Sequence, residues 1–328
     1  MKSVAICNSL AGISNLLHIK LIHVISPLKK ERKNHMNIAI FADLHGRILL
    51  AFKLCARWQR ETGEQIDLIL QAGDLGAYPD FTRLDRATRK YAERDPTELG
   101  FLQHFVQYDP KVATILAETN CPMIFVRGNH EDHGWLDQLE QQSQGAIFPI
   151  DAYQRVFNLK TGIPWTFQKE DEQITVLGIG RIAPHEGESD IYASKYIQPY
   201  ELERIYDLEK TPIDVLLTHH SRTDFVILER GVKIKASTGM REIEYILDRD
   251  QPAYHFFGHY GGPPQIRTDT NEVTLAVKLA DLHWGHGNPT LDEGSMGMLR
   301  WHNAEEHTFE LIDEHWLNEY TAFGWEYV

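Results

Sequence analysis

Residues 36–46 read MNIAIFADLHG, and this stretch decides the fold. Its apolar run Asn37–Ala42 predicts a buried strand, and the helical spacing of apolar residues over Ile48–Arg60 predicts a helix soon after it. Between the two stand Asp43 and His45, residue types that ligate metal ions. A strand that ends in polar residues and leads into a helix is typical of the carboxyl edge of an α/β sheet.

The same alternation of short apolar runs and longer helical patterns continues along the body of the chain, and no linker or repeat divides it. It predicts an α/β fold. Further strands are expected at Ile66–Ala72, Pro122–Arg127, Ile174–Gly178, Ile213–Thr218, Tyr254–Gly258, Val273–Leu279, Met298–His302 and Thr308–Ile312. The last few of these have the character of an antiparallel meander.

Three segments depart from this alternation, and the domain is expected to span 36–328. Tyr78–Thr119 is too long for a bare loop and has a charged and aromatic helical pattern, which predicts a helical insertion near the rim of the sheet. Residues 313–328 form an acidic C-terminal tail. Residues 1–35 are basic and lack the roughly 18 clean apolar residues of a membrane span. We expect them to precede a native start at Met36, to form a flexible arm or to serve as an organelle address.

Composition and charge exclude several classes of protein. With 42% hydrophobic and 24% charged residues, the chain is neither a collagen, a disordered tail nor a membrane bundle. Residues 36–328 hold 27 basic and 46 acidic residues, a net charge of −19, which repels phosphate backbones. A long nucleic acid is therefore disfavoured as a partner, though not excluded, and no membrane partner is expected, since the chain lacks an apolar span. Cys7, Cys55 and Cys121 show no disulfide or zinc-finger spacing, which favours a reducing compartment, the cytoplasm.

Polar residues follow five of the predicted strands at the point where each strand ends. They are Asp43 and His45, Gly73 and Asp74, the run Arg127–Glu131, the run Thr218–His220, and the run Gly258–Gly261. Carboxylates, an amide and imidazoles without cysteine suit Mn²⁺, Fe²⁺, Fe³⁺ or Zn²⁺ in a mixed oxygen and nitrogen shell. Asp74 could bridge two cations at the separation of about 3.5–4 Å used in phosphate chemistry.

Each of these segments has an ordinary structural alternative when it is taken alone. Asp-x-His occurs three times in the chain, at Asp43, Asp281 and Asp313, and only the first directly ends a clean apolar strand. Gly73-Asp74 could be a simple turn, and His219 or His259 could be a hydrogen-bonded core histidine. The ordered combination, with each member at a strand end, favours one shared site.

This ordered set resembles the calcineurin-like metallophosphoesterase superfamily over residues 36–262. The resemblance implies a four-layer sandwich of two mixed β-sheets flanked by helices, with a centre for up to two divalent metal ions. One metal would be held by Asp43, His45 and Asp74, and the other by Asp74, Asn129, His219 and His259. His219 is preferred to His220 because it directly follows Thr218.

The sequence departs from the family at one position. The usual motif ends in Gly-His-x-His, whereas residue 261 is glycine here. We expect water or weakened binding at the first metal, and His283 or His286 is the alternative ligand.

The resemblance also implies an enzyme that hydrolyses ester bonds, in which metal-activated water attacks phosphorus. His130 would be the acid that protonates the leaving group. Arg127 offers a bidentate fork for phosphate oxygens, with a structural salt bridge as the alternative.

A small phosphodiester, phosphomonoester or nucleotide is the expected substrate. Protein Ser/Thr phosphatases are disfavoured because Leu75–Tyr78 replaces their Val-Asp-Arg-Gly after Gly73-Asp74. Residues 212–219 and 73–75 are faintly similar to lariat-debranching phosphodiesterases, so an RNA phosphodiesterase of the 2′-5′ or lariat type is one alternative. A non-catalytic binding scaffold on the same fold is the other. The sequence does not indicate an oligomeric state.

Overall fold

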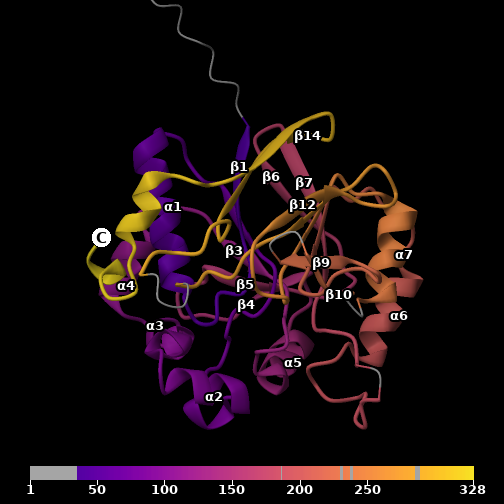
Figure 1. Ribbon diagram of the computed structural model, residues 1–328, viewed down its shortest axis with the longest axis horizontal. Helices are drawn as coiled ribbons and strands as arrows, with labels where there is room; N and C mark the ends of the chain where they lie inside the picture. Colours follow the sequence, from indigo (N-terminus) through magenta and orange to yellow (C-terminus); the bar gives the residue numbers. More distant parts are fainter. Residues whose placement is uncertain (1–34, 186, 230–231, 237–238, 285–288) are drawn as a thin grey trace, which may run out of the picture. The chain divides into compact units, whose positions relative to one another are not determined.

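The computed structural model describes residues 35–185, 187–229, 232–236, 239–284 and 289–328, and His35–Val328 form a unit of their own (Figure 1). The basic extension predicted at 1–35 therefore lies outside the described residues, except for His35. Within the described part of the chain, no helix is long and apolar enough to cross a membrane.

The first sheet has seven strands in the order β15-β14-β1-β2-β3-β5-β4. Its centre is parallel, because β1, β2, β3 and β5 pair side by side in the same direction, and β14, β15 and β4 run antiparallel to their neighbours. The strands are β1 (Met36–Phe41), β2 (Leu68–Gln71), β3 (Met123–Phe125), β4 (Ile147–Pro149), β5 (Val156–Leu159), β14 (Gly297–Asn303) and β15 (Glu306–Leu311).

The second sheet has six strands in the order β12-β13-β11-β8-β7-β6. Four central strands are again parallel, and β12 and β6 close the two edges in the antiparallel sense. The strands are β6 (Trp165–Lys169), β7 (Glu172–Ile179), β8 (Val215–Thr218), β11 (Tyr254–Phe257), β12 (Gln265–Thr268) and β13 (Leu275–Lys278). A separate hairpin consists of β9 (Val226–Glu229) and β10 (Val232–Ala236).

Alternating side chains of the central strands explain how the two sheets are stacked. On β1, Ile38 and Ile40 belong to a buried core that also contains Val215 and Leu217 of β8, so these residues pack between the sheets. Ala39 and Phe41 point the other way, into a second core shared with α1 (Ile48–Thr62). Because both faces of β1 are buried, its sequence is apolar throughout.

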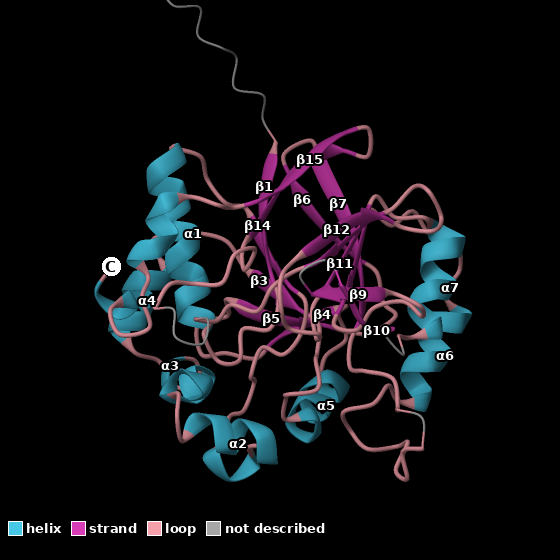
Figure 2. Cartoon of the chain, viewed as in Figure 1, coloured by secondary structure: helices cyan, strands magenta, loops and turns pink. Residues whose placement is uncertain are grey.

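Helices cover the outer face of each sheet, as Figure 2 shows. The first sheet is covered by α1 and α4 (Pro110–Leu116), and the second by α6 (Pro199–Asp207) and α7 (Arg241–Asp250). The predicted sandwich of two mixed sheets flanked by helices is therefore confirmed. The short strands β4, β5, β6, β9, β10 and β12 were not among the sequence-based expectations.

Residues 81–116 contain five short helices, η1 (Phe81–Arg83), α2 (Arg86–Ala92), η2 (Pro96–Leu99), α3 (Gly100–His104) and α4. Of these, α3 and α4 pack against helix α1 of the first sheet. A Cβ at Gly100 would lie 2.2 Å from the carbonyl oxygen of Gly46, so this segment touches the loop that carries His45. Only glycine at 100 permits that approach.

The C-terminal segment also packs against α1. It contains η3 (His315–Glu319) and η4 (Trp325–Tyr327), and the side chains of Trp316, Tyr320 and Trp325 are buried in the core that α1 shares with the first sheet. Lys53 Nζ fixes the end of the chain, because it donates to the carbonyl oxygens of Trp325 and Glu326 at 3.2 and 2.6 Å.

Candidate metal centre

The parallel strands bring the predicted site residues to one edge, because their carboxyl ends meet there. The loops after β1 and β2 run side by side: the Asp43 amide donates to the Gly73 carbonyl at 3.0 Å, and the His45 amide donates to the Asp74 carbonyl at 2.9 Å. From the second sheet, the amide of Gly258 donates to the His219 carbonyl at 3.2 Å, and the amide of His259 donates across to Asp43 Oδ2 at 3.0 Å. Residues from both sheets therefore border the same space.

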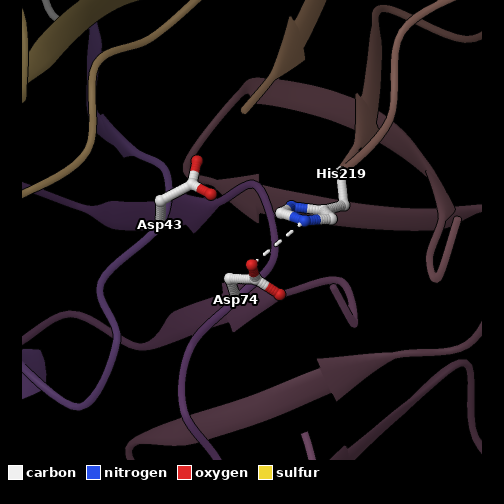
Figure 3. A group of neighbouring side chains, drawn as sticks. All are labelled: Asp43, Asp74 and His219. Carbon is white, nitrogen blue, oxygen red and sulfur yellow. Dashed lines mark ion pairs between the residues drawn. The ribbon is translucent and has the colours of Figure 1, made fainter. Parts of the chain in front are cut away.

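Asp43, Asp74 and His219 form a buried group that could hold a metal ion. One ligand atom from each lies within 4.8 Å of the others, and Figure 3 shows the three side chains facing one another. His219 Nε2 lies 3.3 Å from Asp74 Oδ2. Carboxylate and imidazole ligands at this spacing are the donor set expected for a divalent cation.

Further ligand atoms gather around His219 Nε2. Asn129 Oδ1 lies 3.2 Å from it and His259 Nδ1 lies 3.1 Å from it. His219 Nδ1 is 2.9 Å from the Ala72 carbonyl, which can only accept, so Nδ1 carries a proton and Nε2 is the nitrogen that would bind a cation in place of its own proton. One cation could bind His219 Nε2, Asn129 Oδ1 and His259 Nδ1 together. A hydrogen bond from the other ring nitrogen to a backbone carbonyl, as His219 makes with Ala72, is typical of a metal-ligating histidine.

The electrostatics of the group also favour a cation. Burial raises the pKa of Asp43 well above its usual value, and the neighbouring Asp281 raises it further. Burial disfavours a charge on His219, but the carboxylates of Asp74 and Asp43 outweigh it and raise the pKa of His219 to about 9. The site therefore concentrates negative charge that a positive ion would offset.

His45 lies on the more open side of the group. Its Nε2 is 3.8 Å from Asp74 Oδ2, and its Nδ1 is 3.8 Å from Glu98 Oε2, a buried carboxylate of the insertion. Burial lowers the pKa of His45 to about 4, so the ring is neutral and able to ligate.

Four of the six predicted ligands have left-handed backbone conformations. The φ angles are 48° at Asp43, 43° at His45, 53° at Asp74 and 75° at His259. Such angles are uncommon for residues other than glycine and cluster at functional sites, where the surrounding structure enforces them. The backbone at these four residues is therefore strained, and this conformation directs their side chains into the site.

Two carboxylates of the site are fixed by main-chain amides. Asp74 Oδ1 accepts from the amides of Asn129 and His130 at 2.6 and 2.7 Å. Asp43 accepts from the amide of His259 at 3.0 Å. Glu131 acts in the same way, because it accepts from the amides of Leu75 and Ala77 at 2.8 Å and so joins the loops after β2 and β3. Its role is to orient these loops.

His130 is paired with a residue that the sequence did not single out. Its Nδ1 lies 2.7 Å from Asp85 Oδ2, and Tyr78 donates to the same oxygen at 2.5 Å. The rings of His130 and His45 lie 5.4 Å apart, so His130 borders the candidate metal centre. Asp85 caps the helix α2 by accepting from the Thr88 amide, and this capping pattern is the only sequence signal it carries.

The structure places the Arg127 side chain away from these ligand atoms. Its guanidinium is buried and pairs with Asp137 and Glu140 of α5 (His133–Gln142), at 2.6 Å in the case of Glu140. A buried fork already held by two carboxylates has no free face for phosphate. These contacts favour the structural salt bridge over the phosphate fork.

The remaining histidines are placed as follows. His220 is buried behind the site, with its ring 4.9 Å from that of His259 and 5.6 Å from that of Tyr260. His283 is partly exposed and lies 3.8 Å from Asp292. His286, the other alternative ligand, lies outside the described residues.

The profile of the calcineurin-like phosphoesterase family matches residues 36–262. A search of curated proteins found no match.

Among solved structures, the protein TT1561 of Thermus thermophilus is 15% identical, with a TM-score of 0.45, over 85% of this chain and 99% of that one. A protein serine/threonine phosphatase from Saccharomyces cerevisiae is 16% identical, with a TM-score of 0.30, over 85% of this chain and 81% of that one. TM-scores below 0.5 carry no information on substrate. The match of the family profile covers most of the chain, and the chain belongs to the calcineurin-like phosphoesterase family.

Proposed function

We propose that this protein is a metal-dependent phosphoesterase that hydrolyses a small phosphodiester, phosphomonoester or nucleotide. The observation that carries the proposal is the position of Asp74. Its Oδ2 faces His45 on one side and His219 on the other, at 3.8 and 3.3 Å, so one carboxylate borders both groups of ligand atoms. A bridging carboxylate between two cations is the arrangement of two-metal phosphate chemistry.

The residues present fit two divalent cations. Asp43, His45 and Asp74 would hold the first, and Asp74, Asn129, His219 and His259 the second. When bound, such cations supply Lewis acidity toward phosphoryl oxygens and lower the pKa of water. Mn²⁺, Fe²⁺, Fe³⁺ or Zn²⁺ suits this oxygen and nitrogen donor set.

His130 holds the proton that the leaving oxygen would receive. Burial disfavours its charged form, but Asp74 and the hydrogen bond with Asp85 outweigh this and raise its pKa to about 9. Asp85 binds Nδ1, so Nε2 is the atom left to act as the acid toward the substrate. Arg127 is not part of this proposal, because its guanidinium is used inside the fold.

A small substrate agrees with the surrounding charges. Arginines around the site are already paired: Arg47 with Asp95 at 2.5 Å, and Arg83 with Asp132 at 2.8 Å. A protein with few free cations here and a net charge of −19 over residues 36–328 repels an extended phosphate backbone. The two alternative functions, an RNA phosphodiesterase and a non-catalytic scaffold, are distinguished by substrate hydrolysis. A cytoplasmic location stays a prediction.

Hydrolysis of p-nitrophenyl phosphate and bis-p-nitrophenyl phosphate with added Mn²⁺ tests the proposal. We expect turnover that a chelator removes, a loss of at least about 100-fold in Asp74→Asn and His219→Gln, and parental rates in His315→Gln, an exposed control. Turnover that persists with chelator would contradict the metal mechanism. Metal binding without turnover of any phosphoester would favour the scaffold, and cleavage of branched or 2′-5′ RNA alone would favour the RNA enzyme.

A further inference from the structure

A further carboxylate, that of Asp281, lies beside the first group of ligands. Asp281 follows β13 in the second sheet and forms a parallel bridge with Ala42, the residue before Asp43. The next amide, that of Leu282, donates to the Asp43 carbonyl at 3.3 Å. The chain around Asp281 is therefore aligned with the end of β1, where the candidate metal centre begins.

One oxygen of this carboxylate has no protein partner. Asp281 Oδ1 is buried and accepts no hydrogen bond from the described residues. The nearby ammonium group of Lys278 is engaged elsewhere, because it donates to the carbonyls of Gly262 and Pro263 at 3.1 and 3.0 Å. A buried carboxylate oxygen without a donor is unfavourable, and a cation is the usual compensation.

Residue 261 leaves room next to the same carboxylate. Gly261 has a φ of 58°, and a Cβ built on it would meet only one group within 4 Å, Asp281 Oδ2 at 3.9 Å. A side chain at 261 would therefore extend into space that borders Asp281. The Asp281 carboxylate therefore has one oxygen without a hydrogen-bond donor, Oδ1, and one oxygen beside the space that a side chain at 261 would fill, Oδ2.

We propose that the Asp281 carboxylate is a ligand of the first metal, together with Asp43, His45 and Asp74, on the side that Gly261 leaves open. The inference rests on the proposed function. It replaces the expectation of water or weakened binding at this position, with His283 or His286 as the alternative ligand. With three carboxylates and one imidazole, the first site is richer in oxygen than the second, which favours Mn²⁺ over softer metals.

Metal stoichiometry tests the proposal without reference to activity. Metal-free protein is dialysed against Mn²⁺, bound metal is counted by mass spectrometry, and free Mn²⁺ is followed by electron paramagnetic resonance. We expect two ions per chain in the parent, and one tight ion in Asp281→Ala with the other weakened by about 100-fold or more. Asp292→Ala is the matched control, because that carboxylate lies in the same loop and its side chain is 43% exposed. It should bind two ions.

A rescue variant and a stability measurement complete the test. Gly261→His combined with Asp281→Ala should regain part of the lost affinity for the second ion, because a side chain at 261 has room, although the φ of 58° strains any residue other than glycine. Without metal, Asp281→Ala should unfold at the parental temperature or above it, since removing the charge relieves repulsion with Asp43. Its rise in Tm on adding Mn²⁺ should be smaller. If Asp281→Ala does not fold, Asp281→Asn gives the same comparison with the side-chain shape kept.

The outcomes separate this inference from the proposed function. Asp281 variants that keep the parental number of ions and the parental affinity would overturn the ligand assignment alone, whether that number is two or one. A parent that binds no Mn²⁺ would overturn the proposed function and this inference with it.

Discussion

Asp85 Oδ2 lies 2.7 Å from His130 Nδ1, so a carboxylate of the helical segment 81–116 holds the histidine that borders the metal centre. The same oxygen accepts from Tyr78 at 2.5 Å, and the other carboxylate oxygen accepts from the Thr88 amide at 2.8 Å. Hydrogen bonds from His130, Tyr78 and Thr88 outweigh burial and lower the pKa of Asp85, so it stays ionised. The helical segment therefore orients a ring of the site.

Asp85→Asn should lower kcat by about 10- to 100-fold with little change in KM, because the ring loses its orientation and its preference for a proton. The loss should be greater for an ester with an alcohol leaving group than for one that releases p-nitrophenol, which leaves without a proton. Steady-state kinetics on both esters measure this difference. Asp80→Asn, which changes only the charge of an exposed residue that caps η1, should leave both rates unchanged. Equal losses on the two esters would contradict an acid role for His130.

Arg127→Met should destabilise the fold by about 1.5–3 kcal/mol, because Glu140 loses its buried partner and keeps only the half-buried Arg204, while Asp137 keeps the buried Arg181. Unfolding in urea measures this loss. Arg127→Lys keeps the charge and should leave KM for phosphoesters unchanged. The exposed pair of Arg60 and Glu118 is the control, and Arg60→Met should cost less than about 1 kcal/mol. If Arg127→Lys raised KM tenfold at parental stability, the result would favour the interpretation that Arg127 binds the phosphate of the substrate.

The ends of the central strands could be predicted from the sequence, because burial on both faces makes such strands apolar throughout. β1 is buried along its whole length, and the residue types change abruptly at Asp43. Parallel strands then bring their carboxyl ends to one edge, which places Asp74 and His219 near Asp43 without knowledge of the loops. β5 is as short as the predicted β2, but Asn158 interrupts its apolar run, so its pattern does not differ from that of a loop.

Residues that reach the site through tertiary packing could not be predicted. Asp85 and Glu98 belong to the helical segment 81–116, and their contacts with His130 and His45 depend on how that segment packs on the rest of the fold. Asp281 begins an Asp-x-His triplet that does not directly follow an apolar strand, and only its bridge to Ala42 brings it beside Asp43. The ion pairs of Arg127 likewise depend on where α5 packs.

Gly258→Ala should weaken metal binding, because a Cβ at this position would lie 1.9 Å from Asp43 Oδ2. The carboxylate has to move away from its hydrogen bond with the His259 amide, so we expect about tenfold or greater loss of Mn²⁺ affinity. Calorimetric titration with Mn²⁺ measures it. Gly134→Ala is the control, because its Cβ would meet nothing closer than 3.4 Å and it lies in α5. Parental affinity in Gly258→Ala would show that Asp43 is not held as described.

His255 should make the stability of the metal-free protein depend on pH. The ring is buried on β11, its Nε2 lies 2.8 Å from Thr218 Oγ1, and that hydroxyl lies 2.5 Å from the His220 carbonyl. Burial lowers the pKa of His255 to about 3, and Asp269 and Arg222 are its charged neighbours. The neutral ring donates to Thr218, which donates in turn to His220, so this chain of bonds orders the loop that carries His219.

The sign of the effect follows from proton binding. Unfolded histidine has a pKa of about 6.5, so the unfolded state takes up a proton below that pH while the folded state does not until about pH 3. As the pH is lowered from about 6.5 to about 3, this group alone therefore decreases the free energy of unfolding by about 1.4 kcal/mol per pH unit. Above pH 6.5 its contribution does not change with pH. His255→Gln keeps a donor for Thr218 and should reduce the slope between pH 6 and 4.5 by about one proton, measured by urea unfolding with chelator present. The exposed His315→Gln should keep the parental slope, and a parental slope in His255→Gln would show that the ring is already protonated in the folded state.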